Sequence, residues 1–186
     1  MIEIRDLTVT LGGKTVLDGY SASFPQEGLT YLSGPSGVGK TTLLRVLAGI
    51  QAPDRGSVTL TGRSVLLFQE DRLFPRQTAL KQVEAVLPRE RRGEAGAWLE
   101  LTELGDAAQK LPEELSGGMA RRLALARCLA IEGDLYLLDE PFAGVDLERA
   151  ERILARLRTL GKPVLLTGHA PELADLCDWK TELVTA

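Results

Sequence analysis

The stretch Gly34-Pro-Ser-Gly-Val-Gly-Lys-Thr-Thr42 lies between the apolar run LTYLS and the segment LLRVLAG. Its first eight residues match the pattern G-x-x-x-x-G-K-[ST]. LTYLS is typical of a buried strand, and TTLLRVLAG of a helix that ends at Gly49. In a turn between strand and helix, glycines let backbone N–H groups point inward, and the helix N-terminus adds a favourable dipole. The stretch therefore predicts a cradle for phosphate oxygens.

Each residue of this loop is a candidate nucleotide contact. Lys40 would place its charge on the β- and γ-phosphates, and the Thr41 hydroxyl is the expected Mg²⁺ ligand. A chance match to the pattern is expected in roughly one chain in a hundred of this length, and the strand and helix on either side lower that figure. The expected nucleotide-binding residues are Gly34, Pro35, Ser36, Gly37, Val38, Gly39, Lys40, Thr41 and Thr42.

A second apolar run, LYLLDE, ends in two acidic residues. A buried strand would deliver Asp139 beside the phosphate loop, where its carboxylate could hold Mg²⁺ through water. Glu140 could act as a general base toward the attacking water. The alternative for this run alone is an acidic strand end that faces solvent.

His169 is the only histidine and ends the run PVLLTGH. A single histidine is more often structural than functional. At a strand end on the probable ligand edge of a sheet, however, we expect it to contact the γ-phosphate or the water and Glu140.

Short apolar runs alternate with predicted helices, which is typical of a parallel sheet covered on both faces. Alternating polar and apolar residues near the N-terminus indicate additional strands with one buried face, and GSVTLTG and SVLLFQ indicate two more. From Thr78 to about Gln109 the pattern is helical, broken at Pro88 and Gly93, with the charge run RERRGE as a solvated loop or helix face.

The predicted fold class is therefore α/β, with a phosphate-loop NTPase core of mostly parallel sheet flanked by helices. An antiparallel β-subdomain precedes it and a small helical subdomain is inserted. We expect one domain over 1–186, with the core and β-subdomain in 1–74 and 131–186 and the helical subdomain in about 75–130. Further helices are expected from LSGGM to about Ala130 and from Leu147 to about Leu160.

The composition is that of a soluble globular protein, with 44% hydrophobic residues, 26% charged residues and a net charge of −4. This acidic balance argues against charge-driven binding to nucleic acid. The N-terminal sequence resembles no targeting signal, and no apolar run approaches the roughly 20 residues of a membrane span. Cys128 and Cys177 have no metal-ligand spacing and are interpreted as small core residues in a reducing, cytosolic compartment, and Trp98 and Trp179 as packing residues.

Taken in order, these motifs resemble the nucleotide-binding subunit of an ATP-binding cassette (ABC) transporter, from the N-terminal strands through His169. The matching pieces are GPSGVGKTT, Gln69 in LLFQED, LSGGM, LYLLDEP, FAGVD with Asp146, and TGHAPE with His169. The segment FQEDRLFPRQTAL further resembles importers for nitrate, taurine and aliphatic sulfonates.

The resemblance implies a head-to-tail cassette dimer, homomeric or heteromeric, with ATP and Mg²⁺ between the phosphate loop of one subunit and LSGGM of the other. It also implies an integral membrane permease as partner and a peripheral location on the cytoplasmic face of the membrane. Gln69 would touch Mg²⁺ and relay the nucleotide state, and Asp146 would contact the opposite subunit. The γ-phosphate of the opposite subunit would be bound by Ser116, Gly117 and Gly118.

Four features depart from the family pattern. Met119 stands where the signature usually ends in Gln, and Ala143 where the loop before Asp146 usually begins with Ser. The aromatic residue that stacks on adenine would align near Leu11, so aliphatic packing would replace a contact worth about 1–3 kcal/mol on other scaffolds. The helical insertion and C-terminal segment are also short, so we expect a minimal cassette.

Two alternatives to a transport ATPase stay open. One is a soluble cassette ATPase that acts on ribosomes or DNA, although the chain has one phosphate loop and no sustained heptads. The other is a module that binds nucleotide without turning it over. Under the leading interpretation ATP closes the dimer, and hydrolysis assisted by Glu140 reopens it.

Overall fold

The computed structural model describes residues 2–184, and the chain divides into two compact units. The first unit comprises Met1–Leu66, Gly133–Glu140 and Gly161–Ala186. The second comprises Leu67–Glu132 and Pro141–Leu160. The chain thus crosses between the units several times, so each unit is assembled from segments that are distant in sequence.

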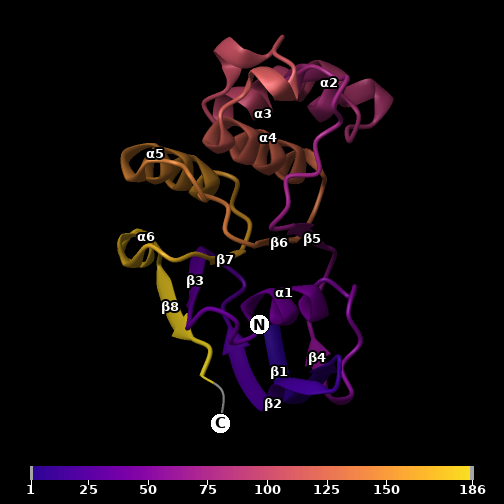
Figure 1. Ribbon diagram of the computed structural model, residues 1–186, viewed down its shortest axis with the longest axis vertical. Coiled ribbons are helices and arrows are strands. Elements are labelled where there is room, and N and C mark those ends of the chain that lie inside the picture. The colour runs from indigo at the N-terminus through magenta and orange to yellow at the C-terminus, as the bar shows by residue number, and fades with distance from the viewer. Residues whose placement is uncertain (1, 185–186) are drawn as a thin grey trace. The chain divides into compact units, whose positions relative to one another are not determined.

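An antiparallel sheet forms the N-terminal part of the first unit (Figure 1). Its strands are β1 (Ile2–Leu11), β2 (Lys14–Phe24) and β4 (Arg55–Thr59), in the order β2-β1-β4. β1 pairs with both neighbours, because one edge meets β2 along a hairpin and the other meets β4. The alternation of buried and exposed residues in β1 explains why this sheet could be expected from the sequence.

The main sheet of the first unit has the strand order β5-β6-β7-β3-β8. β3 runs parallel to β7 and β8, and β6 runs parallel to β7. The strands β3, β6 and β7 are almost wholly buried, which is why they appear in the sequence as continuous apolar runs. Their bounds are Leu29–Ser33 for β3, Ser64–Leu67 for β5, Leu135–Leu138 for β6, Val164–Thr167 for β7 and Trp179–Glu182 for β8.

Two helices belong to this unit, α1 (Lys40–Leu47) and α6 (Pro171–Asp175). α1 contacts β6, and α6 contacts β3. The apolar face of α1 joins side chains of both sheets in one core, which includes Leu7, Leu32, Leu43 and Leu137. The parallel sheet with its helices and the antiparallel N-terminal sheet confirm the predicted α/β fold class.

The edge strand β8 corrects the interpretation of Trp179. We expected Trp179 to be a packing residue, but it begins β8 and is 50% exposed. An edge strand has one neighbour only, so its side chains are covered less than those of β3 beside it. Trp98, by contrast, packs against the core of the second unit as expected.

The second unit is helical, and its core is made by α2, α3 and α4 with the turns that join them. The charge run at Arg89–Glu94 forms a short 3-10 helix with no buried residue, which agrees with a solvated face. Cys128 lies in α4 and is buried, and burial raises the pKa of its thiol to about 12. The helices are α2 (Ala79–Glu84), η1 (Arg89–Glu94), α3 (Ala95–Leu101), η2 (Gly105–Ala107), η3 (Pro112–Glu114), α4 (Gly117–Ala130) and α5 (Leu147–Arg158).

Two arginines of α4 attach the segment after β5 to the helical unit. Arg121 is 3% exposed and donates to the carbonyls of Phe68 at 2.8 Å and Gln69 at 3.1 Å. Arg127 donates to the carbonyl of Asp71 at 2.9 Å. These contacts bind the segment to α4, and Leu67–Glu132 form part of the second unit. Among residues 2–184, no helix is both long and apolar enough to cross a bilayer.

Candidate functional site

The phosphate loop connects β3 to α1 within the first unit. Gly34 has φ 144° and Gly39 has φ 114°, values that side chains rarely permit. A Cβ at Gly34 would lie 2.8 Å from the carbonyl oxygen of Leu183, and one at Gly39 would lie 2.9 Å from Leu17 Cδ2. Both glycines are therefore needed for backbone conformation and for space, and the loop geometry depends on them.

Lys40 is the first residue of α1, and its side chain folds back over the loop. Its ammonium donates to the carbonyl of Gly34 at 2.6 Å and to that of Pro35 at 2.9 Å, and the residue is only 7% exposed. A cation held in this way lies inside the curl of backbone that the motif predicts as a phosphate cradle. Pro35, Ser36 and Gly37 are exposed, so the outer rim of the loop is open to a ligand.

Asp139 and Glu140 follow β6 at the carboxyl edge of the same sheet. β7 lies between β6 and β3 in the strand order, so both acids emerge at the edge from which the phosphate loop emerges. Two strand spacings are about 10 Å, a span that a nucleotide phosphate with its metal can bridge. The sheet thus brings together residues that are about 100 positions apart in the sequence.

Thr167, the last residue of β7, organises the two acids and was not predicted. Its hydroxyl donates to Asp139 Oδ1 at 2.9 Å and accepts the backbone N–H of Glu140 at 2.9 Å. Thr167 is fully buried and Asp139 is 3% exposed, so this pair is shielded from water. Glu140 adopts φ 50°, a left-handed conformation that non-glycine residues seldom take, and the hydrogen bond from its amide helps to hold it there.

His169 lies beside Glu140, with 2.9 Å between Nε2 and Glu140 Oε1. The Glu140 side chain is 20% exposed and that of His169 is 60% exposed. The pair is accessible to water while one carboxylate oxygen is held in place. This arrangement suits a base that accepts a proton from water and a neighbour that orients it.

The oxygen atoms expected to hold Mg²⁺ in the first unit are the hydroxyl of Thr41 and the carboxylate of Asp139. These are hard ligands of the kind that Mg²⁺ takes when phosphate oxygens and water complete its octahedron. Within residues 2–184, no group of three or more His, Cys, Asp and Glu side chains is placed to hold a metal by itself. The Thr41 hydroxyl and the Asp139 carboxylate are oxygen ligands that fit Mg²⁺ bound to a nucleotide.

The LSGGM turn opens α4 in the second unit. Ser116 caps the helix, and its hydroxyl accepts the backbone N–H of Met119 at 3.3 Å. Ser116 and Gly117 are exposed, whereas Gly118 approaches the carbonyl of Gly144 so closely that a Cβ would lie 2.4 Å from that oxygen. Met119 packs against the helical core, so the departure at this position serves packing.

Asp146 and Gln69 also belong to the second unit. Asp146 caps α5 through the backbone N–H of Arg149 at 2.9 Å and accepts the guanidinium of Arg149 at 2.8 Å. These two contacts lower the pKa of the Asp146 carboxyl. The backbone of Gln69 is held by Arg121, and its side chain is exposed. Its contact with Mg²⁺ and the contact of Asp146 with an opposite subunit stay predictions.

Two further departures, at Leu11 and Ala143, lie on the surface. Leu11 ends β1 at the tip of the hairpin and is 38% exposed, so an aliphatic side chain is available where the family has an aromatic one. Ala143 is exposed in the turn before α5.

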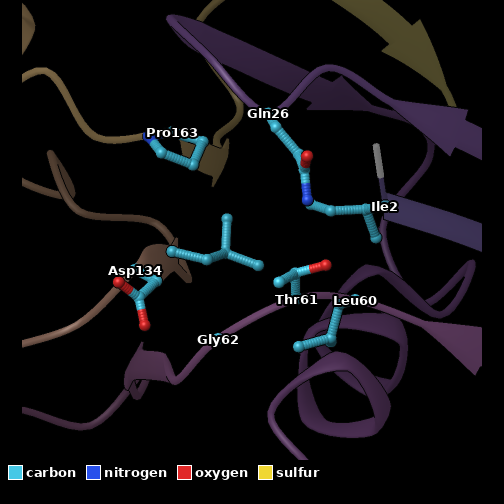
Figure 2. Close-up of a pocket in the computed structure, with 8 residues that line it drawn as sticks. Ile2, Gln26, Leu60, Thr61, Gly62, Asp134 and Pro163 are labelled. Atoms are coloured by element: carbon cyan, nitrogen blue, oxygen red, sulfur yellow. The ribbon is translucent and has the colours of Figure 1, made fainter.

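A cavity of about 380 Å³ lies at the opposite edge of the main sheet (Figure 2). Leu135 begins β6 and Pro163 precedes β7, so the cavity adjoins the amino ends of these strands. The Asp134 carboxylate at its rim already accepts the backbone N–H of Arg63 at 2.8 Å. The phosphate loop and the acids that follow β6 lie at the other edge, so this cavity is separate from the candidate site.

The family model described as ABC transporter matches residues 17–143. An aliphatic sulfonates import ATP-binding protein, SsuB 1 of Nocardia farcinica, is 45% identical over 147 residues, covering 78% of this chain and 60% of that protein. The intermembrane phospholipid transport system ATP-binding protein MlaF of Escherichia coli K12 is 34% identical over 206 residues, covering 96% and 77%. A sulfate/thiosulfate import ATP-binding protein, CysA of Rhodopseudomonas palustris, is 38% identical and is covered over 54% of its length.

Solved structures of ATP-binding cassettes also resemble this chain. The dimeric post-hydrolysis state of an ATP-binding cassette with bound ADP and phosphate superposes with a TM-score of 0.85 at 27% identity, covering 98% of this chain and 94% of that one. The chain spans 60% of the sulfonate relative and about half of the sulfate relative. The chain belongs to the ABC transporter family of cassette ATPases, which confirms the family expected from the motifs.

Proposed function

We propose that this chain binds ATP with Mg²⁺ and hydrolyses it as the nucleotide-binding subunit of an ABC transporter. In this proposal two cassettes close head to tail on ATP and drive an integral membrane permease from its cytoplasmic face. The proposal is supported by family membership and by relatives named as ATP-binding proteins of import and phospholipid transport systems. The observation that carries it is the Glu140–His169 contact at the sheet edge that also bears the phosphate loop.

The residues divide the chemistry between them. The loop backbone and the Lys40 ammonium bind the phosphates and offset their charge. Mg²⁺, held by Thr41 and Asp139, would screen the charge that develops on the phosphate oxygens. Glu140 accepts the proton of the attacking water, and His169 orients the carboxylate. Thr167 helps to give the two acids different roles. Its hydroxyl donates to the Asp139 carboxylate and accepts the backbone N–H of Glu140, so only Asp139 is bound to Thr167 through its side chain.

The second unit would complete the site of the opposite subunit. The exposed hydroxyl of Ser116 and the backbone N–H groups at the start of α4 would contact the γ-phosphate, because a helix N-terminus favours an anion. Gln69 would sense Mg²⁺, and the segment from Gln69 to about Gln82 would carry the change to the permease. Since the sulfonate and sulfate relatives described above are importers by name, an import system is the favoured partner.

The test is steady-state phosphate release by the purified chain, alone and with its co-purified membrane subunit. Glu140→Gln should still bind ATP but lose at least 100-fold in turnover, since one general base contributes about 10²–10⁴-fold. It should also accumulate an ATP-bound dimer, visible by size-exclusion chromatography with light scattering. The control is Glu27→Gln, an exposed carboxylate in the turn before β3, which should behave as wild type.

The outcomes separate the alternatives. ATP binding without phosphate release by the wild type, with or without the membrane subunit, would leave a binding-only module. Co-purification with ribosomes or DNA in place of a membrane protein would favour a cassette outside transport. Full activity in Glu140→Gln would show that the base has been misassigned.

A further inference from the structure

The turn that follows α3 holds an acidic residue in an unusual conformation. Glu103 adopts φ 56°, in the left-handed region, although it is not glycine. Its side chain is only 17% exposed. Non-glycine residues persist in this conformation where their surroundings hold them. The contacts of Glu103 therefore indicate its role.

Three arginines of α5 converge on the Glu103 carboxylate. Arg149 Nε donates to Oε2 at 3.0 Å, and Arg152 donates to both oxygens, at 2.7 and 3.0 Å. Arg156 Nη2 lies 3.5 Å from Oε1. The hydrogen bond from Arg152 is the main cause that lowers the pKa of Glu103 to about 2. A carboxylate that accepts several charge-assisted hydrogen bonds fixes the helix that supplies them.

The backbone of the same turn is held from the other side. Arg122 of α4 is 5% exposed, and its Nη1 donates to the carbonyls of Thr102, at 2.9 Å, and Glu103. Arg122 lies three residues after Met119, the last residue of LSGGM. The turn at Glu103 therefore joins α5 to the helix that LSGGM opens.

Arg149 extends this connection to Asp146. Its guanidinium donates to Glu103 through Nε and to Asp146 Oδ2 through Nη1, at 2.8 Å. The turn before Asp146 meets LSGGM directly, because the carbonyl of Gly144 occupies the space where Gly118 would carry a Cβ. LSGGM and the Asp146 turn are thus linked in two ways. One link is the direct contact of Gly118 with Gly144, and the other runs from α4 through Glu103 and Arg149 to Asp146.

We propose that Glu103 is a positioning residue that holds the Asp146 turn in register with LSGGM, so that the second unit presents both to the opposite subunit as one surface. This inference rests on the proposed function. Removing the charge of Glu103 would leave the guanidinium groups of three arginines facing one another. Arg149 would keep its ion pair with Asp146, and Arg152 its ion pair with the exposed Glu148. Arg156 would keep its hydrogen bonds to the carbonyls of Glu100 and Leu101. Arg149 would then lose the contact that fixes its direction, and the Asp146 turn would become mobile relative to α4.

The experiment compares Glu103→Gln with Glu148→Gln in the full chain. Glu148 also pairs with Arg152, at 2.8 Å, but its side chain is 85% exposed. The first measurement is hydrogen exchange of the amides from 144 to 149. We expect exchange at least tenfold faster in Glu103→Gln and within twofold of wild type in Glu148→Gln.

The second measurement is the dependence of ATPase activity on protein concentration. Glu103→Gln should need at least tenfold more protein for half-maximal specific activity, while the affinity of its phosphate loop for ATP, measured on the monomer, stays within twofold. A role in stability alone would lower the folded fraction without moving this midpoint once the concentration is expressed as folded protein, measured by circular dichroism. If both variants match wild type in exchange and in midpoint, the inference is wrong.

Two further variants keep the test decisive. Glu103→Asp should recover part of the loss, since a carboxylate is restored on a shorter side chain. Should Glu103→Gln fail to fold, Arg149→Met removes the link to Asp146 while Arg152 still holds Glu103, and the same two shifts are expected. If the wild type neither hydrolyses ATP nor dimerises, the proposed function fails, and hydrogen exchange at 144–149 still decides whether Glu103 holds the Asp146 turn.

Discussion

The two glycines of LSGGM should respond in opposite ways to the same substitution. Gly117 and Gly118 are successive residues at the start of α4, and neither has a positive φ. A Cβ on Gly117 would meet nothing within 4 Å, whereas one on Gly118 would lie 2.4 Å from the Gly144 carbonyl oxygen. Alanine therefore fits at the first position and collides with backbone at the second.

The magnitude follows from that difference in space. Gly→Ala in a helix gains up to about 1 kcal/mol, and both variants share this gain. Gly118→Ala must move two backbone segments apart by close to 1 Å, and overpacking of this kind typically costs about 1–3 kcal/mol. We expect Gly118→Ala to be about 2 kcal/mol less stable than Gly117→Ala, which for a chain of this size is roughly 4–8 °C in Tm.

The assay is equilibrium unfolding in urea followed by circular dichroism, with thermal melts in parallel. The m-values should agree between the variants, so that the shift in midpoint reports stability. Equal stabilities, or a more stable Gly118→Ala, would refute the close approach of the two turns. Activity is expected to fall in both variants, since each methyl group also lies in the segment predicted to bind phosphate, so stability rather than turnover is the discriminating measurement.

Three other perturbations test separate parts of the molecule. Thr167→Val should lower stability by about 1–3 kcal/mol, because it removes the Thr167 hydroxyl that donates to the buried Asp139 carboxylate. It should also reduce turnover at least tenfold, while Thr167→Ser restores both in paired unfolding and phosphate-release assays. Folding lowers the pKa of Glu103 to about 2. The stabilisation from its ion pairs is therefore fully present above the unfolded pKa of about 4.3 and is lost as the pH falls toward 2. Between pH 5 and 3, the urea midpoint should fall less in Glu103→Gln than in wild type. Leu11→Tyr should tighten ATP binding about 5- to 150-fold if stacking recovers about 1–3 kcal/mol, and unchanged affinity by fluorescence titration would place adenine elsewhere.

The surface of the second unit shows where prediction from sequence was limited. The exposed hydroxyl of Ser116 and the cap formed by Asp146 could be anticipated, because each precedes a helical pattern as capping residues do. That Gly118 lies against Gly144 could not, since a glycine in a helix start is compatible with open space, as Gly117 demonstrates. Met119 stands where the signature usually ends in Gln, and only the structure shows that it packs against the helical core.

The role of Thr167 could have been predicted from the sequence. It stands two residues before His169 in the run PVLLTGH, at the last position of a fully buried strand. A buried hydroxyl requires hydrogen-bond partners, and the acids that follow β6 were the available ones at the same sheet edge. The edge strand β8 gave no such signal, because its four residues are largely polar and exposed.

By itself, the sequence determined the phosphate loop, the order of buried strands and helices, and the family. These depend on residue types at fixed local spacings: glycines where φ is positive, apolar runs where strands are buried on both faces, and caps where helices begin. The tertiary structure alone decided that Thr167 joins Asp139 to Glu140, that Arg121 binds the segment after β5 to α4, and that Glu103 gathers three arginines of α5. The physical reason is that these contacts join residues 27 to 52 positions apart, whose approach depends on how whole elements pack and leaves no periodic trace in the chain.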